Sequence, residues 1–305
     1  MRPRSLVLAS VAASLLTFPL LTCVPRAHAQ AEGVSTEERA AFHRDPQWVM
    51  IAPHLPDPKT ASAKQLETAA DVLRARRFPE DALDYYGYAI ARGAPVSEIL
   101  NKMGVVRLEL RQTDMAHTLF QQTVRAQKKN ASGWNNLGVT EYMDKRYKNA
   151  INDYRRAAKL DKRSATFHCN LGMAYFESTD MESARKEFAT ALALDPRAFD
   201  HRDVGGDMAQ VVGTQNYSQL AFEMAKIYAA HHDDAATLLW LAKATEAGYD
   251  TRNEMQQDSA LKLYIHDPRV ILMLKNAQQM RARSVAAAAA PAQSLGPASE
   301  DRRFN

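Results

Sequence analysis

Residues 131–164 read ASGWNNLGVTEYMDKRYKNAINDYRRAAKLDKRS, and residues 165–198 read ATFHCNLGMAYFESTDMESARKEFATALALDPRA. The second segment repeats the pattern of the first at a spacing of 34 residues. Six pairs of positions carry the pattern: Trp134 and His168, Leu137 and Leu171, Gly138 and Gly172, Ala150 and Ala184, Tyr154 and Phe188, and Ala157 and Ala191. A period of this length indicates one supersecondary unit that is copied along the chain and buries its apolar face by stacking on its neighbours.

The same frame continues towards the N-terminus over two further blocks. At the slots of Gly138, Ala150 and Tyr154, the earlier blocks hold Gly104, Ala116 and Phe120, and before them Ala70, Ala82 and Tyr86. The centre of the chain is therefore four contiguous blocks, 63–96, 97–130, 131–164 and 165–198. We expect the small residues to let two antiparallel helices of a block approach closely, and the aromatic residue to fill the space towards the next block.

These residues resemble the signature of the tetratricopeptide repeat family, W-x2-L-G-x2-Y, then A-x3-F, then P, on a period of 34. Trp134, Leu137 and Gly138 match its first part, and Ala184, Phe188 and Pro196 match the rest. The resemblance implies an all-α fold, a right-handed α-solenoid of stacked antiparallel helix pairs. It also implies binding of protein partners rather than catalysis.

Residues 1–29 have the three-part layout of a secretory signal peptide. Two arginines begin it, residues 6–21 are apolar, and small residues place a cleavage site near Ala29. We therefore expect export, with the mature protein in the periplasm or outside the cell. A retained membrane anchor and lipid attachment at Cys23 are the alternatives, and they are the only routes to a membrane that the sequence indicates.

Residues 30–62 form an N-terminal extension before the first repeat. Ser35 and Glu38 have the spacing of a capping box that begins a short helix. The stretch that follows is too apolar for a free linker, and we expect four of its residues to lie against the first repeat as a lid: Trp48, Val49, Met50 and Ile51. A mostly disordered linker is the alternative.

The period breaks after Ala198. The remaining segments are a glycine-containing loop over 199–217, a degenerate repeat over 218–251, a linker and C-terminal capping helix over 252–283, and a disordered tail over 284–305. The capping helix is predicted from Asp267 followed by Pro268, an N-cap and a proline in the first turn.

Charge and motifs exclude several classes of function. The formal net charge is +4 at pH 7, and no basic stripe is evident in the sequence, so we expect no nucleic-acid partner. The sequence contains no phosphate-binding loop, dinucleotide fingerprint, nucleophile elbow or zinc-protease motif. We therefore expect no enzyme activity, no cofactor and no small-molecule substrate.

Two groups of residues are weak candidates for chemistry. Residues 231–234, His-His-Asp-Asp, fall where a turn between paired helices belongs, so a solvated turn is favoured over a metal site. Cys169, beside His168, is expected to be a buried structural thiol rather than a nucleophile.

In the family that the chain resembles, the first helix of each repeat lines a concave groove that binds peptides. The slots concerned predict a partner-binding groove of Asn101, Val105, Leu108, Asn135, Val139, Tyr142, Met143, Met173 and Phe176, with Cys169 in the same set. The first block contributes charged residues there: Lys64, Glu67, Asp71 and Arg74. The middle blocks lack the lysines and arginine of a carboxylate clamp, so we expect apolar anchors. The alternative is that much of this set packs beneath the next helix.

The sequence thus predicts an exported, non-catalytic scaffold that binds a peptide or helix of a partner protein in its concave groove. The alternative is a self-assembling structural repeat protein of the cell envelope. The capping helix argues against open stacking, because terminal caps stop it. The partner itself is not identified by any of these residues.

Overall fold

The computed structural model describes residues 35–199 and 216–289. These ranges contain fourteen α-helices, two short 3-10 helices and no β-strand, which confirms the predicted all-α fold of stacked helix pairs. The predicted signal peptide, nearly all of the 199–217 loop and the last part of the tail lie outside them. Within them, no helix has both the length and the apolar character needed to cross a bilayer.

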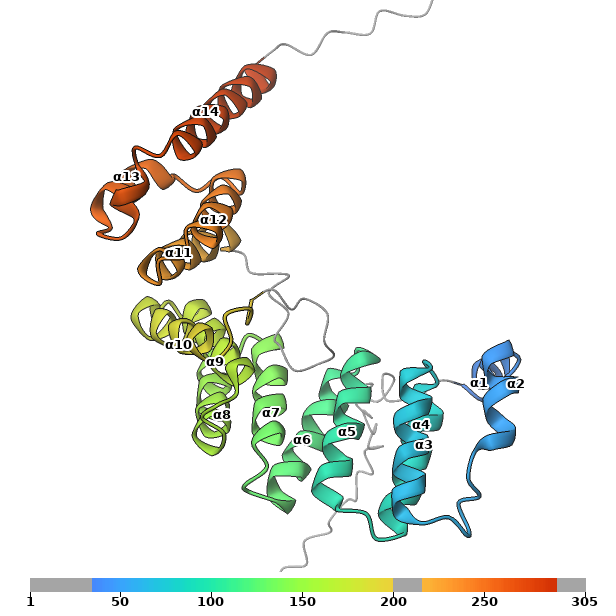
Figure 1. The fold of residues 1–305 in the computed structure, drawn as a ribbon. Helices are drawn as coiled ribbons and strands as arrows, with labels where there is room; N and C mark the ends of the chain where they lie inside the picture. The colour runs from blue at the N-terminus through green and yellow to red at the C-terminus, as the bar shows by residue number, and fades with distance from the viewer. Residues whose placement is uncertain (1–34, 200–215, 290–305) are drawn as a thin grey trace, which may run out of the picture.

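Five antiparallel helix pairs make up the body of the molecule. They are α3 (Ala63–Ala75) with α4 (Pro79–Ala91), α5 (Val96–Glu109) with α6 (Thr113–Ala126), α7 (Ala131–Met143) with α8 (Tyr147–Leu160), α9 (Ala165–Glu177) with α10 (Met181–Leu194), and α11 (Tyr217–Ala230) with α12 (Asp234–Glu246). The second helix of each of the first three pairs also contacts the first helix of the next, so the pairs stack. Figure 1 shows the resulting curved array.

The turn within each pair has one repeated geometry. The middle residue has a positive φ in every case, although none is glycine: Arg77 (65°), Arg111 (61°), Lys145 (59°), Thr179 (67°) and His232 (59°). The next amide then reaches back to a carbonyl five residues earlier, as from Phe78 to Leu73 at 2.9 Å and from Asp180 to Tyr175 at 3.0 Å. This is the Schellman ending, which pairs the last free carbonyls of a helix. The first four left-handed residues are 34 apart.

A glycine–aromatic contact fixes how closely the two helices of a pair approach. A methyl group added at Gly104 would lie 2.4 Å from Phe120, at Gly138 it would lie 2.8 Å from Tyr154, and at Gly172 it would lie 2.5 Å from Phe188. The rings therefore cover the glycine of their own pair, and they also reach the next block, where Phe120 packs in one cluster with Leu137. The neighbouring structural positions are buried, namely Ala116, Leu137, Ala150, Leu171 and Ala184, whereas Trp134 is half-buried and Pro196 is exposed in the turn after α10.

The N-terminal extension docks on the first pair. Ser35 and Glu38 form the predicted capping box at the start of α1 (Thr36–Phe42), followed by α2 (Pro46–Ile51) and the 3-10 helix η1 (Ala52–His54). Trp48 and Ile51 pack on the core of the first pair, with the Trp48 ring 5.1 Å from that of Phe78. Val49 and Met50 instead point to solvent, because a helix presents only one face to the core.

The chain after α12 is more helical than expected. The predicted linker contains α13 (Thr251–Gln257) and the 3-10 helix η2 (Leu261–Tyr264), and the predicted capping helix α14 runs from Pro268 to Ala289. Residues 284–289 therefore belong to a helix and not to a disordered tail, because a run of alanines has high helix propensity. Val270 of α14 is buried, whereas Ile271 and Leu272 are exposed.

Candidate functional site

The first helices of consecutive pairs lie side by side and form a continuous wall. We call α3, α5, α7 and α9 the inner wall. Helix α7 contacts both α5 and α9 directly, and polar side chains join α3 to α5. The contacts link residues about one repeat apart, so the register of the wall follows from the repeat itself.

Ion pairs join α3 to α5. The Lys102 ammonium lies 2.7 Å from a carboxylate oxygen of Glu67 and 2.7 Å from one of Asp71, and the Arg74 guanidinium lies 2.7 Å from Glu109. The hydrogen bond from Lys102 lowers the pKa of Glu67 more than burial raises it. The charged residues that the sequence placed at this end therefore neutralise one another, which leaves little free charge for a ligand.

A chain of side-chain amides joins α5, α7 and α9. Asn170 donates to Asn135 at 2.8 Å, Asn135 donates to Asn136 at 3.1 Å, and Asn136 donates to Asn101 at 3.1 Å. The first three are buried, and Asn101 is half-buried. Because buried amides need partners, this chain sets the spacing of the inner helices. It ends at Asn101, where the wall meets solvent.

The structure divides the nine predicted groove residues into two groups. Val105, Asn135, Val139, Met173 and Phe176 are buried, and three of them belong to the largest core cluster, which runs from α7 to α14. The accessible group is Asn101, Leu108 and Tyr142, which are half-buried, and Met143, which is 44% exposed. Contact of these nine residues with a partner stays a prediction. Only the second group has surface to offer.

Glu177 adds a carboxylate to the accessible group. One of its oxygens is buried and has no hydrogen-bond partner. Burial raises the pKa of Glu177, and interactions with Tyr147 and Lys145 lower it by less. The Tyr142 ring lies 5.5 Å from that of Tyr147, and burial together with the charge of Glu177 raises the pKa of Tyr142. Glu177 occupies the thirteenth slot of its block, the slot of Met143, so extending the slot list to that block would have found it.

The residues weighed for chemistry have structural roles. Cys169 is buried, and burial raises the pKa of its thiol to about 12, as expected for an unreactive cysteine. His168 and Trp134 occupy the same position in consecutive repeats and make the same kind of contact. Their ring nitrogens meet the carbonyls of Lys162 at 3.3 Å and Lys128 at 2.9 Å.

The cluster at 231–234 is a turn between α11 and α12. His231 and His232 are exposed, and Asp233 caps α12 by accepting from the amide of Ala236 at 2.9 Å. Asp234 accepts from the Tyr264 hydroxyl at 2.5 Å. Across residues 35–199 and 216–289, no three His, Cys, Asp or Glu side chains come close enough to share a metal ion.

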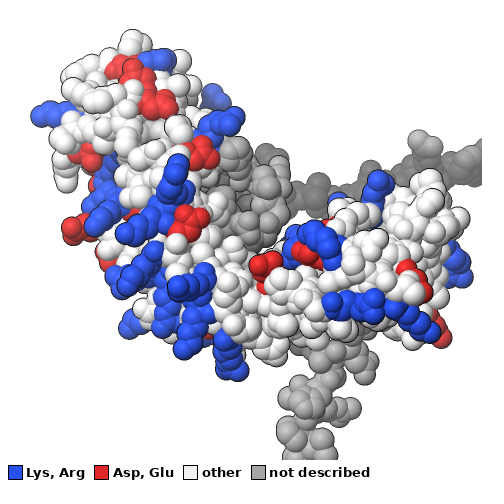
Figure 2. All heavy atoms as spheres, turned by 60° about the horizontal axis from the view of Figure 1, so that its bottom comes forward, with Lys and Arg blue, Asp and Glu red and all other residues white. Residues whose placement is uncertain are grey.

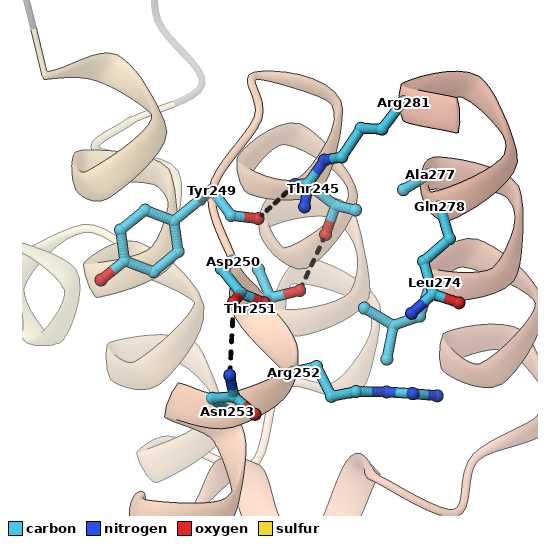
Figure 3. Close-up of a pocket in the computed structure, with 10 residues that line it drawn as sticks. All are labelled: Thr245, Tyr249, Asp250, Thr251, Arg252, Asn253, Leu274, Ala277, Gln278 and Arg281. Atoms are coloured by element: carbon cyan, nitrogen blue, oxygen red, sulfur yellow. Dashed lines mark hydrogen bonds between the residues drawn. The ribbon is translucent and has the colours of Figure 1, made fainter. Parts of the chain in front are cut away.

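A small cleft of 190 Å³ lies between α12, α13 and α14 (Figure 3). Its polar groups bond largely to one another. Thr245 and Thr251 share a hydrogen bond of 3.2 Å, and Asn253 donates to Asp250 at 3.3 Å. Arg281 donates to a backbone carbonyl at 2.9 Å. With these groups paired, the cleft serves to join α14 to the last helix pair and is a weaker candidate than the inner wall.

Comparison with family models identifies part of the chain. Residues 140–178 match a model described as TPR repeat, and residues 165–198 match a model described as tetratricopeptide repeat. The third and fourth blocks therefore contain tetratricopeptide repeats. A search of curated proteins found no match.

Several solved structures resemble the chain at low identity. YrrB, described as a TPR protein with an unusual peptide-binding site, is 19% identical, with a TM-score of 0.42 over 72% of this chain and 97% of its own. MamA from Desulfovibrio magneticus RS-1, from residue 41 to the end, is 19% identical, with a TM-score of 0.44 over 67% and 99%. Another MamA structure is 16% identical, with a TM-score of 0.41 over 54% and 93%.

Proposed function

We propose that this chain is an exported, non-catalytic scaffold that binds a peptide or helix of a partner protein on its inner wall. The observation that carries the proposal is the accessible group on α5, α7 and α9. Leu108, Tyr142 and Met143 offer apolar surface, and the half-buried Glu177 adds a carboxylate whose charge acts on Tyr142. A few apolar anchors beside one polar group are typical of a surface that binds a helix or an extended segment.

The buried residues of the predicted groove support the wall and do not contact the partner. Met173 and Phe176 are 2% and 1% exposed, so a partner cannot reach them without opening the core. The amide chain and the ion pairs hold the inner helices in register. A wall that is already ordered loses little entropy on binding, which favours affinity.

A peptide selected from a displayed random library against the full chain provides the test. We expect Met143→Glu to weaken binding of that peptide by roughly tenfold or more, because it places a charge among the apolar anchors. Leu239→Glu is the matched control, since Leu239 on α12 is 51% exposed and Met143 is 44% exposed. Equal loss in the two variants, or no loss in either, would remove the inner wall as the site. Circular dichroism checks that both variants stay folded.

The prediction that the protein is exported depends on residues 1–29 alone. We expect the mature protein recovered from the producing cell to begin near Gln30. Intact mass of the purified protein tests this, and a mass that includes the leader would leave the retained anchor as the explanation.

Self-assembly remains the second candidate because of α14. This helix exposes three apolar side chains that a second copy could cover, Ile271 (48% exposed), Leu272 (58%) and Met280 (66%). Sedimentation velocity over a wide range of concentrations distinguishes the candidates. A monomer at all concentrations would eliminate self-assembly, and an Ile271→Glu/Leu272→Glu variant would identify the face if larger species form.

A further inference from the structure

Basic side chains gather along one edge of the array, at the end of α6, on the second half of α8 and in the α6–α7 and α8–α9 turns. We call this surface the basic edge. It consists of Arg125, Lys128, Lys129, Arg155, Arg156, Lys159, Lys162 and Arg163, all of them exposed. Figure 2 shows Lys and Arg side chains crowded over one side of the molecule with few Asp or Glu among them. Residues 125–163 contain eleven lysines and arginines and four acidic residues.

The acidic residues of this region do little to neutralise the basic edge. Glu141 and Asp153 are buried, and Asp144 pairs with Arg146 at the opposite end of the helices. Asp161 is exposed and accepts a hydrogen bond from the backbone amide of Arg163 at 3.0 Å. The edge therefore keeps a local excess of positive charge that the net charge of +4 for the whole chain does not reveal.

Two of the eight cations have partners within the fold. The Arg156 guanidinium lies 3.3 Å from Asp153 and 4.5 Å from the centre of the Trp134 ring, and Arg155 lies 5.5 Å from the centre of the Tyr175 ring. The other six form no ion pair within the described part of the chain: Arg125, Lys128, Lys129, Lys159, Lys162 and Arg163. Like charges on one surface repel one another, and an anionic surface placed against them would relieve the repulsion.

An exposed leucine lies next to these cations in the sequence, and a second occupies the equivalent position one repeat later. Leu160, between Lys159 and Asp161, is 42% exposed, and Leu194, one repeat further on, is 39% exposed. Exposed leucines beside lysines suit a bilayer, where the charges meet headgroups and the leucines enter the interface. They contribute nothing to binding of a phosphate backbone.

The edge lacks the features of a nucleic-acid or peptide site. The Trp134 ring, which donates a hydrogen bond to the Lys128 carbonyl in the α6–α7 turn, is covered by Arg156 and is not free to stack on a base. The cations lie on turns and on an outer helix, whereas a peptide would be held on the inner wall. We propose that the basic edge docks the protein on a bilayer that contains anionic lipid. Docking in this way leaves the inner wall free, so the proposal is independent of the proposed function.

Cosedimentation with vesicles tests the proposal. The full chain is mixed with vesicles of phosphatidylcholine alone or with added phosphatidylglycerol. The test variant is Lys128→Gln/Lys129→Gln/Lys162→Gln. The matched control is Arg76→Gln/Arg77→Gln/Arg111→Gln, which removes three exposed, unpaired cations from turns at the other edge of the array. The leader is present in every protein and contributes equally to each.

We expect the wild type to bind the anionic vesicles better than the neutral ones, and raised salt to remove the difference. The test variant should partition into anionic vesicles roughly a hundredfold less, from the usual contribution of each basic residue near such a surface. The control should bind like the wild type. Equal loss in both variants would overturn the assignment to this edge. Equal binding to both kinds of vesicle would overturn an electrostatic role, and binding to duplex DNA without binding to anionic vesicles would overturn the membrane as the partner.

Discussion

Gly172→Ala places a methyl group where the structure has a ring. The new Cβ would lie 2.5 Å from two ring carbons of Phe188, about 1 Å inside normal contact distance. Phe188 is fully buried, so its ring cannot swing out to solvent. Overpacking of this kind costs about 1–3 kcal/mol. Alanine in a helix recovers about 1 kcal/mol over glycine. Because the ring is enclosed, we take the upper half of the overpacking cost, about 2–3 kcal/mol. After the gain in helix propensity is subtracted, we expect the free energy of unfolding to fall by about 1–2 kcal/mol.

Gly87→Ala is the matched control for this prediction. Gly87 lies within α4, and apart from its chain neighbours and the backbone of that helix no atom lies within 4 Å of the position its Cβ would occupy. The same substitution there should therefore stabilise the protein by about 0.5–1 kcal/mol through helix propensity alone. Thermal unfolding followed by circular dichroism compares the two, and we expect melting temperatures to move in opposite directions by about 2–4 °C per kcal/mol. If both variants melt at the same temperature, the glycine–aromatic contact does not limit the approach of the helices.

Two further predictions concern stability. Burial raises the pKa of Asp153 to about 6 in the folded state, whereas its pKa in the unfolded chain is near 4. The folded state therefore loses stability as the pH rises from about 4 to about 6. Asp153→Asn should stabilise the protein at pH 7 by on the order of 2 kcal/mol and have little effect at pH 4. Urea titrations at both pH values measure this, and an equal effect at each would refute it. Thr179→Gly should stabilise by about 1 kcal/mol, because a β-branched residue is strained at a φ of 67°; a lower melting temperature would show that the turn is not strained.

The repeat architecture was readable because side-chain size repeats with the period. Gly138 and Tyr154 recur as Gly172 and Phe188, and a pair of small and large residues at fixed slots can satisfy only one helix crossing. The left-handed turns were not readable in this way. Arg111 and Lys145 share a backbone conformation that glycine favours, yet nothing in their side chains indicates it.

The candidate site was only partly predictable. The slots identify which residues face inwards, but Met173 and Phe176 are buried while Met143 is not, because burial depends on neighbouring helices. The amide chain from Asn101 to Asn170 needed coordinates, since an asparagine at one slot has many possible partners. The basic edge was missed because a net charge is a sum over the whole chain and carries no position.

Two kinds of interaction join neighbouring helices of the inner wall, and they differ in how they respond to salt. Ion pairs join α3 to α5, whereas hydrogen bonds between asparagine side chains join α5 to α7 and α7 to α9. Dissolved ions weaken the attraction between exposed charges and barely affect a buried amide bond. The ion pairs between α3 and α5 are therefore the contacts of the inner wall that rising salt weakens most.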